Sequence, residues 1–387
     1  MLDKYANTAE LIKCCQPEKP VNCLSLGILE DHVRYFQREF PGTVAFAVKA
    51  NPTPAILQGL LDIGILSFDV ASVTEIELLR SLNPQATLFY DNPIKSRAEI
   101  DQAYNDFSVR NFALDDHLEL AKLRDVIGKD ADVEISVRFN GGESTAIYDL
   151  GRKFGANEAE ATSILEKACA SGYKLALTFH PGSQCTSASA YNESITASAA
   201  IEKAAGVQIQ MLNIGGGFPT VYPNSGAPRL TEIFREIGQQ FEYSYQGRDI
   251  ALVCEPGRAL VDPAVSILTR VKHRRSEPVV FLNDGIYGGF MEQLLSKVEL
   301  PTRVFHGSQV LSGATDDFTV FGPTCDSLDV FSYEVPLPKD IGEGDWIEFG
   351  EMGGYGSCSA TTFNGYSTGD YVYVDAGFPR SVSGIAT

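Results

Sequence analysis

The sequence predicts an α/β protein in which a (β/α)8 barrel, or TIM barrel, is followed by a smaller β-rich domain. Between residues 44 and about 258, short apolar runs alternate with helix-like segments, and eight of these runs have the length of strands. Polar residues or glycines follow the runs, at the rim where barrel enzymes build their active sites. After Arg258 the helical periodicity gives way to alternating β-type runs, which indicate a separate all-β module.

The barrel strands are expected at residues 44–48, 65–70, 86–90, 111–114, 133–139, 175–179, 207–214 and 250–254. Thr53 followed by Pro54 is typical of a helix start, and the spacing of Ser72 and Glu75 is that of a capping box. A doubly wound open sheet would give a similar alternation, so the strand count decides only weakly. The residues at the strand ends favour the barrel; they are Lys49, Asp69, Asn92, Asp115, Arg138, His180, Gly215–Gly217 and Glu255.

The expected domain limits follow from the change near residue 260, where alternating β-type runs replace helical periodicity. We expect residues 24–260 to form the barrel, and residues 1–23 with 261–387 to form the β-domain. The β-type runs of this second domain are expected at residues 264–273, 278–284, 346–351 and 371–375.

Composition excludes several classes of function. The 387 residues carry a formal net charge of −19, which argues against binding to nucleic acid or to an anionic membrane. The eight cysteines form no CxxC pair and the five histidines are scattered, so no metal site is expected. The N-terminus lacks an apolar signal core, and no apolar stretch reaches the roughly 18 residues of a transmembrane helix. We therefore expect a cytoplasmic enzyme with free thiols.

Lys49 is the most informative single residue. It ends the apolar run Val44–Val48 and is followed at once by Ala50-Asn51-Pro52. Burial would disfavour its ammonium form and make the amine nucleophilic, which a Schiff-base lysine requires. A surface lysine at a strand-to-helix turn is the alternative, and only the other strand ends decide against it.

Two loops late in the barrel have the composition of a phosphate site. Gly215-Gly216-Gly217 follow a strand, and three glycines let backbone N–H groups approach an anion closely. A flexible turn is the alternative for a lone glycine triplet. Glu255-Pro256-Gly257-Arg258 follow the eighth strand; Gly257 and Arg258 are candidate phosphate contacts. A carboxylate such as Glu255, facing a pyridine nitrogen, would keep that nitrogen protonated.

His180 and Arg138 carry weaker signals. His180 precedes Pro181-Gly182-Ser183, and a lone histidine in such a place is more often structural than catalytic. If a planar cofactor is bound, the His180 ring could stack on its face and Ser183 could bond its phosphate. Arg138 fits either a cofactor contact or a salt bridge. The capping-box spacing explains Glu75 without any catalytic role.

Together these segments resemble a known family. FAVKANP, SFDVASVTEIELL, FHPGSQC, LNIGGGFP, EPGR, NDGIYGGF, GPTCDSLD and GDWIEFGEMGGYG occur in the order found in eukaryotic-type ornithine decarboxylases. These belong to the fold-type III pyridoxal 5'-phosphate enzymes, which also include lysine and diaminopimelate decarboxylases. The similarity runs from about residue 40 to 366. It implies an alanine racemase-like fold with a C-terminal β-sandwich or barrel-like domain, pyridoxal 5'-phosphate as cofactor, and a homodimer with shared active sites.

The resemblance assigns a role to each candidate residue. Lys49, Cys325, His180 and Glu255 are the implied catalytic set. Lys49 carries the cofactor, Glu255 bonds its pyridine nitrogen, and Cys325 returns a proton to the carbon that has lost CO2. The implied cofactor-binding set is Lys49, Asp69, Arg138, His180, Ser183, Gly215, Gly216, Gly217, Glu255, Gly257, Arg258 and Tyr355. Glu75 resembles a residue near the lysine. The implied substrate-binding set is Asp326, Glu292, Ser296 and Tyr287, with Cys325 and Asp326 supplied across the dimer interface.

Two departures from the family pattern bear on the substrate. The loop after the sixth strand reads His-Pro-Gly-Ser-Gln, closer to diaminopimelate and arginine relatives than to the usual His-Val-Gly-Ser-Gly. Six residues after Phe290, where the family has an aspartate for the distal ammonium, this chain has Ser296. Loss of that carboxylate would remove a contact worth roughly 1.5–3 kcal/mol, unless Glu292 replaces it.

The resemblance therefore implies a decarboxylase of a basic L-amino acid, a role in polyamine formation. Ornithine to putrescine is the first expectation and lysine to cadaverine the second. Because of Ser296, another cationic or modified amino acid is the alternative. A fold-related racemase would need a tyrosine base in the β-domain, and a non-catalytic regulatory homologue would tend to lose the lysine or the phosphate residues, which are intact here.

Overall fold

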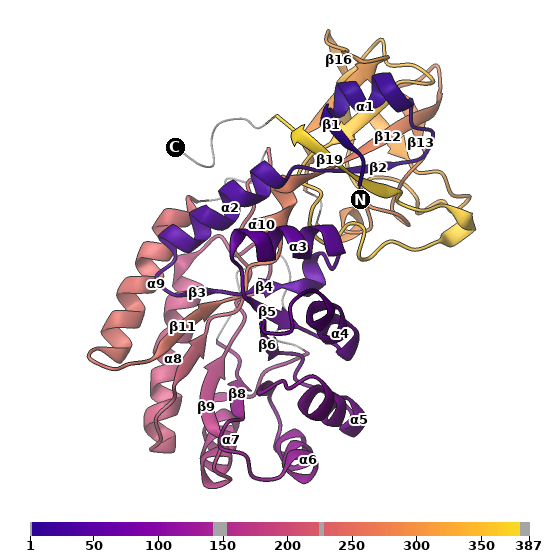
Figure 1. Cartoon of the computed structure of the whole chain (residues 1–387). Helices are drawn as coiled ribbons and strands as arrows, with labels where there is room; N and C mark the ends of the chain where they lie inside the picture. Colours follow the sequence, from indigo (N-terminus) through magenta and orange to yellow (C-terminus); the bar gives the residue numbers. More distant parts are fainter. Residues whose placement is uncertain (1, 142–152, 224–227, 297, 380–387) are drawn as a thin grey trace. The chain divides into compact units, whose positions relative to one another are not determined.

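The computed structural model describes residues 2–141, 153–223, 228–296 and 298–379 (Figure 1). By its internal contacts the chain divides into two compact units. The barrel unit comprises residues 33–219 and 228–257, and the β unit comprises residues 1–32, 220–227 and 258–387. Each unit is described by itself.

The barrel unit contains a nine-stranded, wholly parallel sheet that nearly closes on itself. Its order is β3-β11-β10-β9-β8-β7-β6-β5-β4. The strands are β3 (Thr43–Val44), β4 (Phe46–Ala47), β5 (Ser67–Val70), β6 (Thr87–Tyr90), β7 (Asn111–Leu114), β8 (Glu134–Arg138), β9 (Lys174–Thr178), β10 (Met211–Asn213) and β11 (Ala251–Cys254). The TIM-barrel prediction is confirmed.

The ninth strand arises because the first predicted strand, 44–48, is divided at Ala45. β3 pairs with β11 on one side and β4 pairs with β5 on the other, so one short stretch of chain joins both edges of the sheet. The predicted strand 207–214 is shorter than expected, because only Met211–Asn213 pair with both neighbours, β9 and β11.

Helices flank the barrel strands on the outside (Figure 1). They are α3 (Pro54–Ile63), α4 (Val73–Leu82), α5 (Arg97–Asp101), α6 (His117–Ile127), α7 (Glu158–Ala170), α8 (Ala188–Ala205) and α9 (Leu230–Tyr245), and the unit boundary falls within α2 (Leu26–Glu39). Pro54 begins α3 as predicted, but the Thr53 side chain makes no capping hydrogen bond. The backbone N–H of Thr53 instead donates to the Asn51 side chain.

The β unit is built on a mixed ten-stranded sheet with the order β1-β19-β2-β12-β13-β16-β17. Off this path, β18 pairs with β12, β14 pairs with β18, and β15 pairs with β14. Its strands are β1 (Lys4–Asn7), β2 (Val21–Leu24), β12 (Val265–Arg274), β13 (Val279–Leu282), β14 (Thr302–His306), β15 (Gln309–Val310), β16 (Thr315–Phe321), β17 (Val335–Pro338), β18 (Trp346–Phe349) and β19 (Asp370–Ala376). Three short helices join them: α1 (Thr8–Cys15), α10 (Arg258–Val261) and α11 (Gln293–Ser296).

The chain's first residues belong to this sheet, since β1 pairs with β19, and β2 pairs with both β12 and β19. An aromatic cluster that includes Phe290, Phe331 and Phe349 lies in its core. None of the described helices in either unit combines the length and apolar character needed to cross a membrane.

Candidate active site

Lys49 is aimed at a carboxylate on the neighbouring strand. β4 ends at Ala47, and a single 3-10 turn, Val48–Ala50, carries the lysine past the strand end. Its Nζ lies 2.8 Å from Oδ2 of Asp69, near the end of β5. The expectation that Lys49 is buried is wrong: its side chain is 44% exposed, because the turn buries Val48 and Ala50 and directs the lysine outward.

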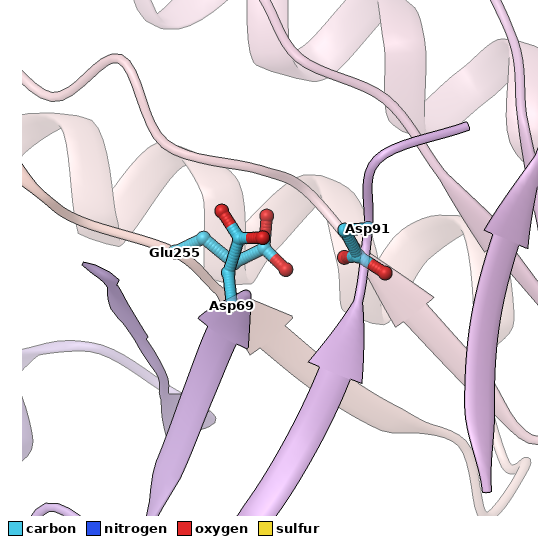
Figure 2. A group of neighbouring side chains, drawn as sticks. All are labelled: Asp69, Asp91 and Glu255. Carbon is cyan, nitrogen blue, oxygen red and sulfur yellow. The ribbon is translucent and has the colours of Figure 1, made fainter. Parts of the chain in front are cut away.

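Three carboxylates meet beyond the strand ends (Figure 2). Asp69 lies near the end of β5, Asp91 directly follows β6, and Glu255 directly follows β11. Their ligand oxygens lie within 4.8 Å of one another. The Nδ2 of Asn213, the fully buried last residue of β10, donates to Asp91 at 3.0 Å and to Glu255 at 2.5 Å. Carboxylates this close would suit a divalent cation, but Lys49 already supplies the cation beside Asp69.

Burial sets the protonation of this group. It raises the pKa of Glu255 well above its usual value, and repulsion from Asp91 and Asp69 adds to the shift. Burial also raises the pKa of Asp91. For His180, which follows β9, burial lowers the pKa, and the charges of Lys49 and Arg138 lower it further. Its Nδ1 accepts a hydrogen bond from the N–H of Gly182, so the imidazole is neutral.

The glycine-rich turn after β10 is a fixed, close-packed structure. The carbonyl of Gly215 accepts from Glu255 N, and the carbonyl of Gly217 accepts from Cys185 N, both at 2.8 Å. These bonds join the loops after β9, β10 and β11. At Gly217, with φ of 85°, a side chain would collide with the carbonyl oxygen of Gly182.

Donors on these loops are available for an anion. Among the residues that the structure describes, no hydrogen bond is made by the N–H groups of Gly216 and Gly217 or by the hydroxyl of Ser183. Gly257 packs against the turn that carries Lys49, since a Cβ there would lie 2.7 Å from that of Ala50. Available backbone donors on a glycine-rich loop are typical of a phosphate cradle.

Arg138 and Glu75 lie around the same rim. Arg138 ends β8, and its guanidinium lies 5.3 Å from the ring centre of Phe154. Burial lowers the pKa of Arg138, and the nearby carboxylates Asp91 and Glu255 oppose that shift. Glu75 N donates to the Ser72 hydroxyl as the capping box predicts. The carboxylate of Glu75, however, accepts from Ala71 N at 2.6 Å, and burial raises its pKa.

In the β unit, Arg258 is buried among polar partners. Its guanidinium donates to Tyr222 Oη at 3.0 Å, forms an ion pair with Asp262 at 3.4 Å, and contacts the Glu292 carboxylate through both terminal nitrogens, one at 2.7 Å. The ring centre of Tyr355 lies 4.9 Å from the guanidinium. The structure thus joins a predicted phosphate residue, Arg258, to a predicted substrate residue, Glu292, and both roles stay predictions.

A second group in the β unit contains the other predicted substrate residues. Tyr287 donates its hydroxyl to Asp326 Oδ2 at 2.7 Å, and its ring centre lies 4.7 Å from that of Phe363. Hydrogen bonds from Leu328 N and Tyr287 lower the pKa of Asp326, so it is a carboxylate at neutral pH. Cys325 is exposed, and its N–H donates to the Asn364 side chain. The side chain of Ser296 lies outside the described part of the chain.

Comparison with known proteins identifies the family. A model of the "Pyridoxal-dependent decarboxylase, pyridoxal binding domain" matches residues 26–262. The chain belongs to the pyridoxal-dependent decarboxylases. It is 34% identical to the lysine/ornithine decarboxylase of Selenomonas ruminantium over 90% of this chain and 87% of that protein. It is 29% identical to mouse ornithine decarboxylase over 90% of this chain and 78% of that protein.

Solved structures agree. The arginine decarboxylase of Paramecium bursaria Chlorella virus, bound to agmatine, superimposes with a TM-score of 0.84 at 25% identity, covering 94% of this chain and 98% of that one. The lysine decarboxylase of Selenomonas ruminantium gives a TM-score of 0.81 at 32% identity, covering 92% and 93%. The predicted family, cofactor class and enzymatic nature are confirmed: the protein is a pyridoxal 5'-phosphate-dependent decarboxylase.

The barrel residues of this decarboxylase fit the cofactor. The amine of Lys49, the buried carboxylate of Glu255, and the free donors of Gly216, Gly217 and Ser183 offer a covalent partner, a partner for the ring nitrogen and a phosphate cradle. Their individual roles stay predictions. They all come from loops at the carboxyl ends of the parallel strands, where barrel enzymes bind their ligands.

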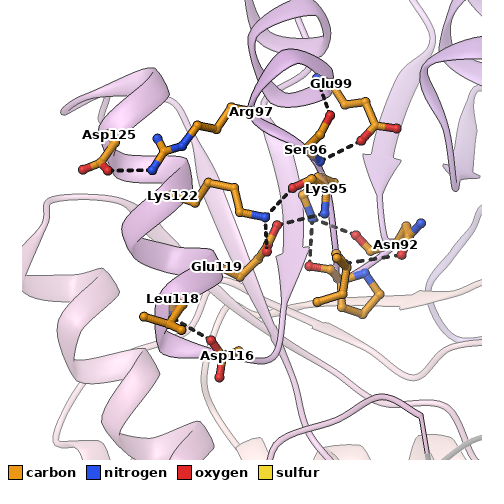
Figure 3. Close-up of polar contacts among 12 residues, drawn as sticks. Asn92, Lys95, Ser96, Arg97, Glu99, Asp116, Leu118, Glu119, Lys122 and Asp125 are labelled. Carbon is orange, nitrogen blue, oxygen red and sulfur yellow. Dashed lines mark hydrogen bonds and ion pairs between the residues drawn. The ribbon is translucent and has the colours of Figure 1, made fainter.

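Sequence reasoning missed Asp91, Asn213 and Lys95. Lys95 is 1% exposed, and its ammonium donates to the backbone carbonyls of Asn92 and Ala113 at 2.7 and 2.5 Å (Figure 3). Burial lowers its pKa to about 8. It fixes the loop that carries Asp91. From sequence alone, a lysine five residues beyond a strand is expected at the surface, so only the fold shows that Lys95 is buried.

Proposed function

We propose that the protein decarboxylates a basic L-amino acid, with ornithine or lysine as the substrate. The observation that carries this proposal is the anionic Asp326, held by Tyr287, in a chain whose barrel unit gathers Lys49, Asp69 and Glu255. A partly exposed carboxylate with its pKa lowered by hydrogen bonds is a partner for a distal ammonium group. The relatives named for lysine, ornithine and arginine decarboxylation support the same class.

The reaction consumes one proton and releases CO2. Bound pyridoxal phosphate supplies a conjugated, protonated pyridine ring that accepts the electron pair left when the bond between the α-carbon and the carboxylate breaks. Glu255, oriented by Asn213, holds the proton at the ring nitrogen. Lys49 provides the amine for covalent attachment. Cys325 donates a proton to the α-carbon, so that the product is the amine.

The remaining barrel residues act on binding. The N–H groups of Gly216 and Gly217 and the hydroxyl of Ser183 bind the phosphate. The neutral ring of His180 packs on the cofactor without adding a positive charge that would oppose pyridine protonation. Asp69 keeps the Lys49 amine at the rim.

The length of the substrate's side chain depends on which group contacts its second ammonium. Glu292, one candidate for the second ammonium contact, is paired with Arg258, and Ser296 replaces the carboxylate that ornithine decarboxylases use. Another cationic or modified amino acid is therefore the second candidate. The subunit arrangement is also proposed: a homodimer in which Cys325 and Asp326 serve the partner's barrel.

A panel assay tests the function. The cofactor-loaded protein is incubated with L- and D-ornithine, lysine, arginine and diaminopimelate, and CO2 and amine are both measured. We expect stoichiometric CO2 and diamine from L-ornithine or L-lysine, and none from a Lys49→Ala control. Change of chirality without CO2 release would show a racemase, and CO2 from diaminopimelate alone would overturn the basic-substrate proposal.

A further inference from the structure

Asp91 is a partly buried carboxylate that the proposed chemistry leaves without a role. It follows β6, and its Oδ2 accepts from Asn213 Nδ2 at 3.0 Å. The same Nδ2 donates to Oε1 of Glu255, so one amide group bridges both carboxylates. One oxygen of Asp91 and one of Glu255 lie within 4.8 Å of each other. Ionised carboxylates can only accept hydrogen bonds, so two carboxyl groups this close can bond to each other directly only when they share a proton.

The charges around Asp91 and Glu255 favour such a shared proton. The anionic groups facing it are Asp69 on β5 and Glu134 on β8. The cationic groups are Lys49, Arg138 and Lys95. Asp69 is already paired with Lys49, and Lys95 is held by backbone carbonyls. Two ionised carboxylates this close, one buried and one partly buried, would repel each other, whereas one shared proton halves their charge.

We propose that Asp91 is a positioning residue that acts through Glu255: the two form one acid pair whose shared proton passes to the cofactor's ring nitrogen when the cofactor binds. An O–H bond breaks and an N–H bond forms, so no other reactant is needed. The pyridinium then faces two carboxylates joined by Asn213, which stabilise its positive charge more than Glu255 alone would. This inference rests on the proposed placement of the ring nitrogen at Glu255.

The proposal gives Asp91 an effect that a structural role would not have. Removing its charge while keeping its shape, as in Asp91→Asn, should weaken binding only of a ring that can carry the proton. An analogue of pyridoxal phosphate with CH in place of the ring nitrogen has the same phosphate and aldehyde but no such proton. The protein's affinity for this analogue should therefore be the same with Asp or Asn at position 91.

The test is a set of equilibrium titrations of the full-length apoprotein with pyridoxal phosphate and with this carbon analogue, followed by cofactor absorbance. In the wild-type protein we expect clear preference for the nitrogen-containing ring, and in Asp91→Asn a preference lower by about tenfold or more. The matched control is Asp116→Asn, a similar change at the cap of α6 that keeps a good capping residue. It should leave the preference unchanged.

If Asp91→Asn weakens binding of both ligands equally, the role of Asp91 is purely structural and the proposal is wrong. The proposal is also wrong if Asp91→Asn weakens binding of neither ligand. A second measurement needs no variant: the nitrogen-15 chemical shift of ring-labelled cofactor bound to the wild-type protein. We expect a protonated ring nitrogen from pH 6 to 9, and an unprotonated one would overturn the pair. Neither measurement requires turnover of an amino acid, so failure here is separate from failure of the proposed substrate.

Discussion

The Lys49 ammonium lies 2.8 Å from an Asp69 oxygen, and the two side chains differ widely in exposure, 44% against 2%. The buried carboxylate therefore fixes the direction of an amine that is itself accessible. Tight packing around the lysine would give a nucleophile that no ligand could reach. A covalent catalyst needs an amine that is held in one direction and is also accessible to its ligand. Asp69 holds the amine in place, and the turn after β4 keeps Lys49 accessible.

The first prediction concerns covalent attachment of the cofactor. Borohydride, which reduces a carbon–nitrogen double bond to a stable single bond, should fix the cofactor on Lys49, as read by mass spectrometry of peptides. Lys49→Ala should lose this label and roughly a thousandfold or more in kcat. Lys95 is an internal control: it is buried and its amine is bonded to carbonyls, so it should carry no label. A label on Lys95 would refute the assignment.

The second prediction concerns the substrate's distal ammonium. Asp326→Asn removes the negative charge but keeps the side chain's size. Because charged hydrogen bonds contribute about 1.5–3 kcal/mol, KM for the best diamino acid should rise by roughly 10- to 100-fold. Tyr287→Phe, which removes only the hydroxyl that donates to Asp326, should have a smaller effect in the same direction. An unchanged KM in Asp326→Asn would show that another group binds the ammonium.

Much of the fold could be predicted because local patterns determine it. The strands β5, β6, β7 and β11 lie inside the limits predicted from their apolar runs, and the last three are each followed directly by an acidic residue. Pro54 likewise begins its helix as expected. These features depend on residues close together in the chain.

The site was less predictable where it depends on distant residues. Asn213 links Asp91 to Glu255 only because β10 lies beside β11 and across from β6 in a nearly closed barrel. Arg258 and Glu292 are 34 residues apart, so no local pattern could pair them. The burial of Lys95 follows from carbonyls at the ends of two strands, and sequence spacing carries no sign of it.

The third prediction is a pH dependence of stability in the β unit. Burial raises the pKa of Asp284 to about 7 from an ordinary value of 3.8. A folded protein that holds a proton more tightly than the unfolded chain loses stability as pH rises between those two values. The Asp284 contribution is therefore complete below about pH 4 and lost by about pH 7, with a slope of at most about 1.4 kcal/mol per pH unit.

Asp284→Asn should remove that slope, because an uncharged amide does not titrate. Its oxygen can still accept from Gly285 N, and its NH2 can donate to the Thr368 hydroxyl. Urea unfolding between pH 4 and 8 should show the variant gaining on the wild type as pH rises, whereas the same change at the exposed Asp340 should follow the wild type. Parallel curves for Asp284→Asn and the wild type would contradict the shift.

The last prediction concerns the proposed shared sites of a dimer. Beside Asp326, the large apolar side chains of Leu328 and Phe363 are 61% and 41% exposed. Clustered exposed apolar residues next to functional groups are typical of an interface, and a two-fold dimer would bury two such patches at once. Lys49→Ala and Cys325→Ala should each be nearly inactive alone. If each site combines one subunit's Lys49 with the partner's Cys325, a heterodimer of the two variants has one site with both defects and one intact site.

Random exchange of equal amounts makes about half of all dimers heterodimers, so about a quarter of the sites should be intact. Activity of the mixture should rise toward about a quarter of the wild-type value, at a rate that matches subunit exchange followed by differently tagged chains. A mixture of Lys49→Ala with a Lys49→Ala, Cys325→Ala double variant is the matched control, and it should gain nothing, because every site lacks the lysine. If tagged heterodimers form and the first mixture stays inactive, Cys325 serves its own subunit's barrel and the shared-site arrangement is wrong.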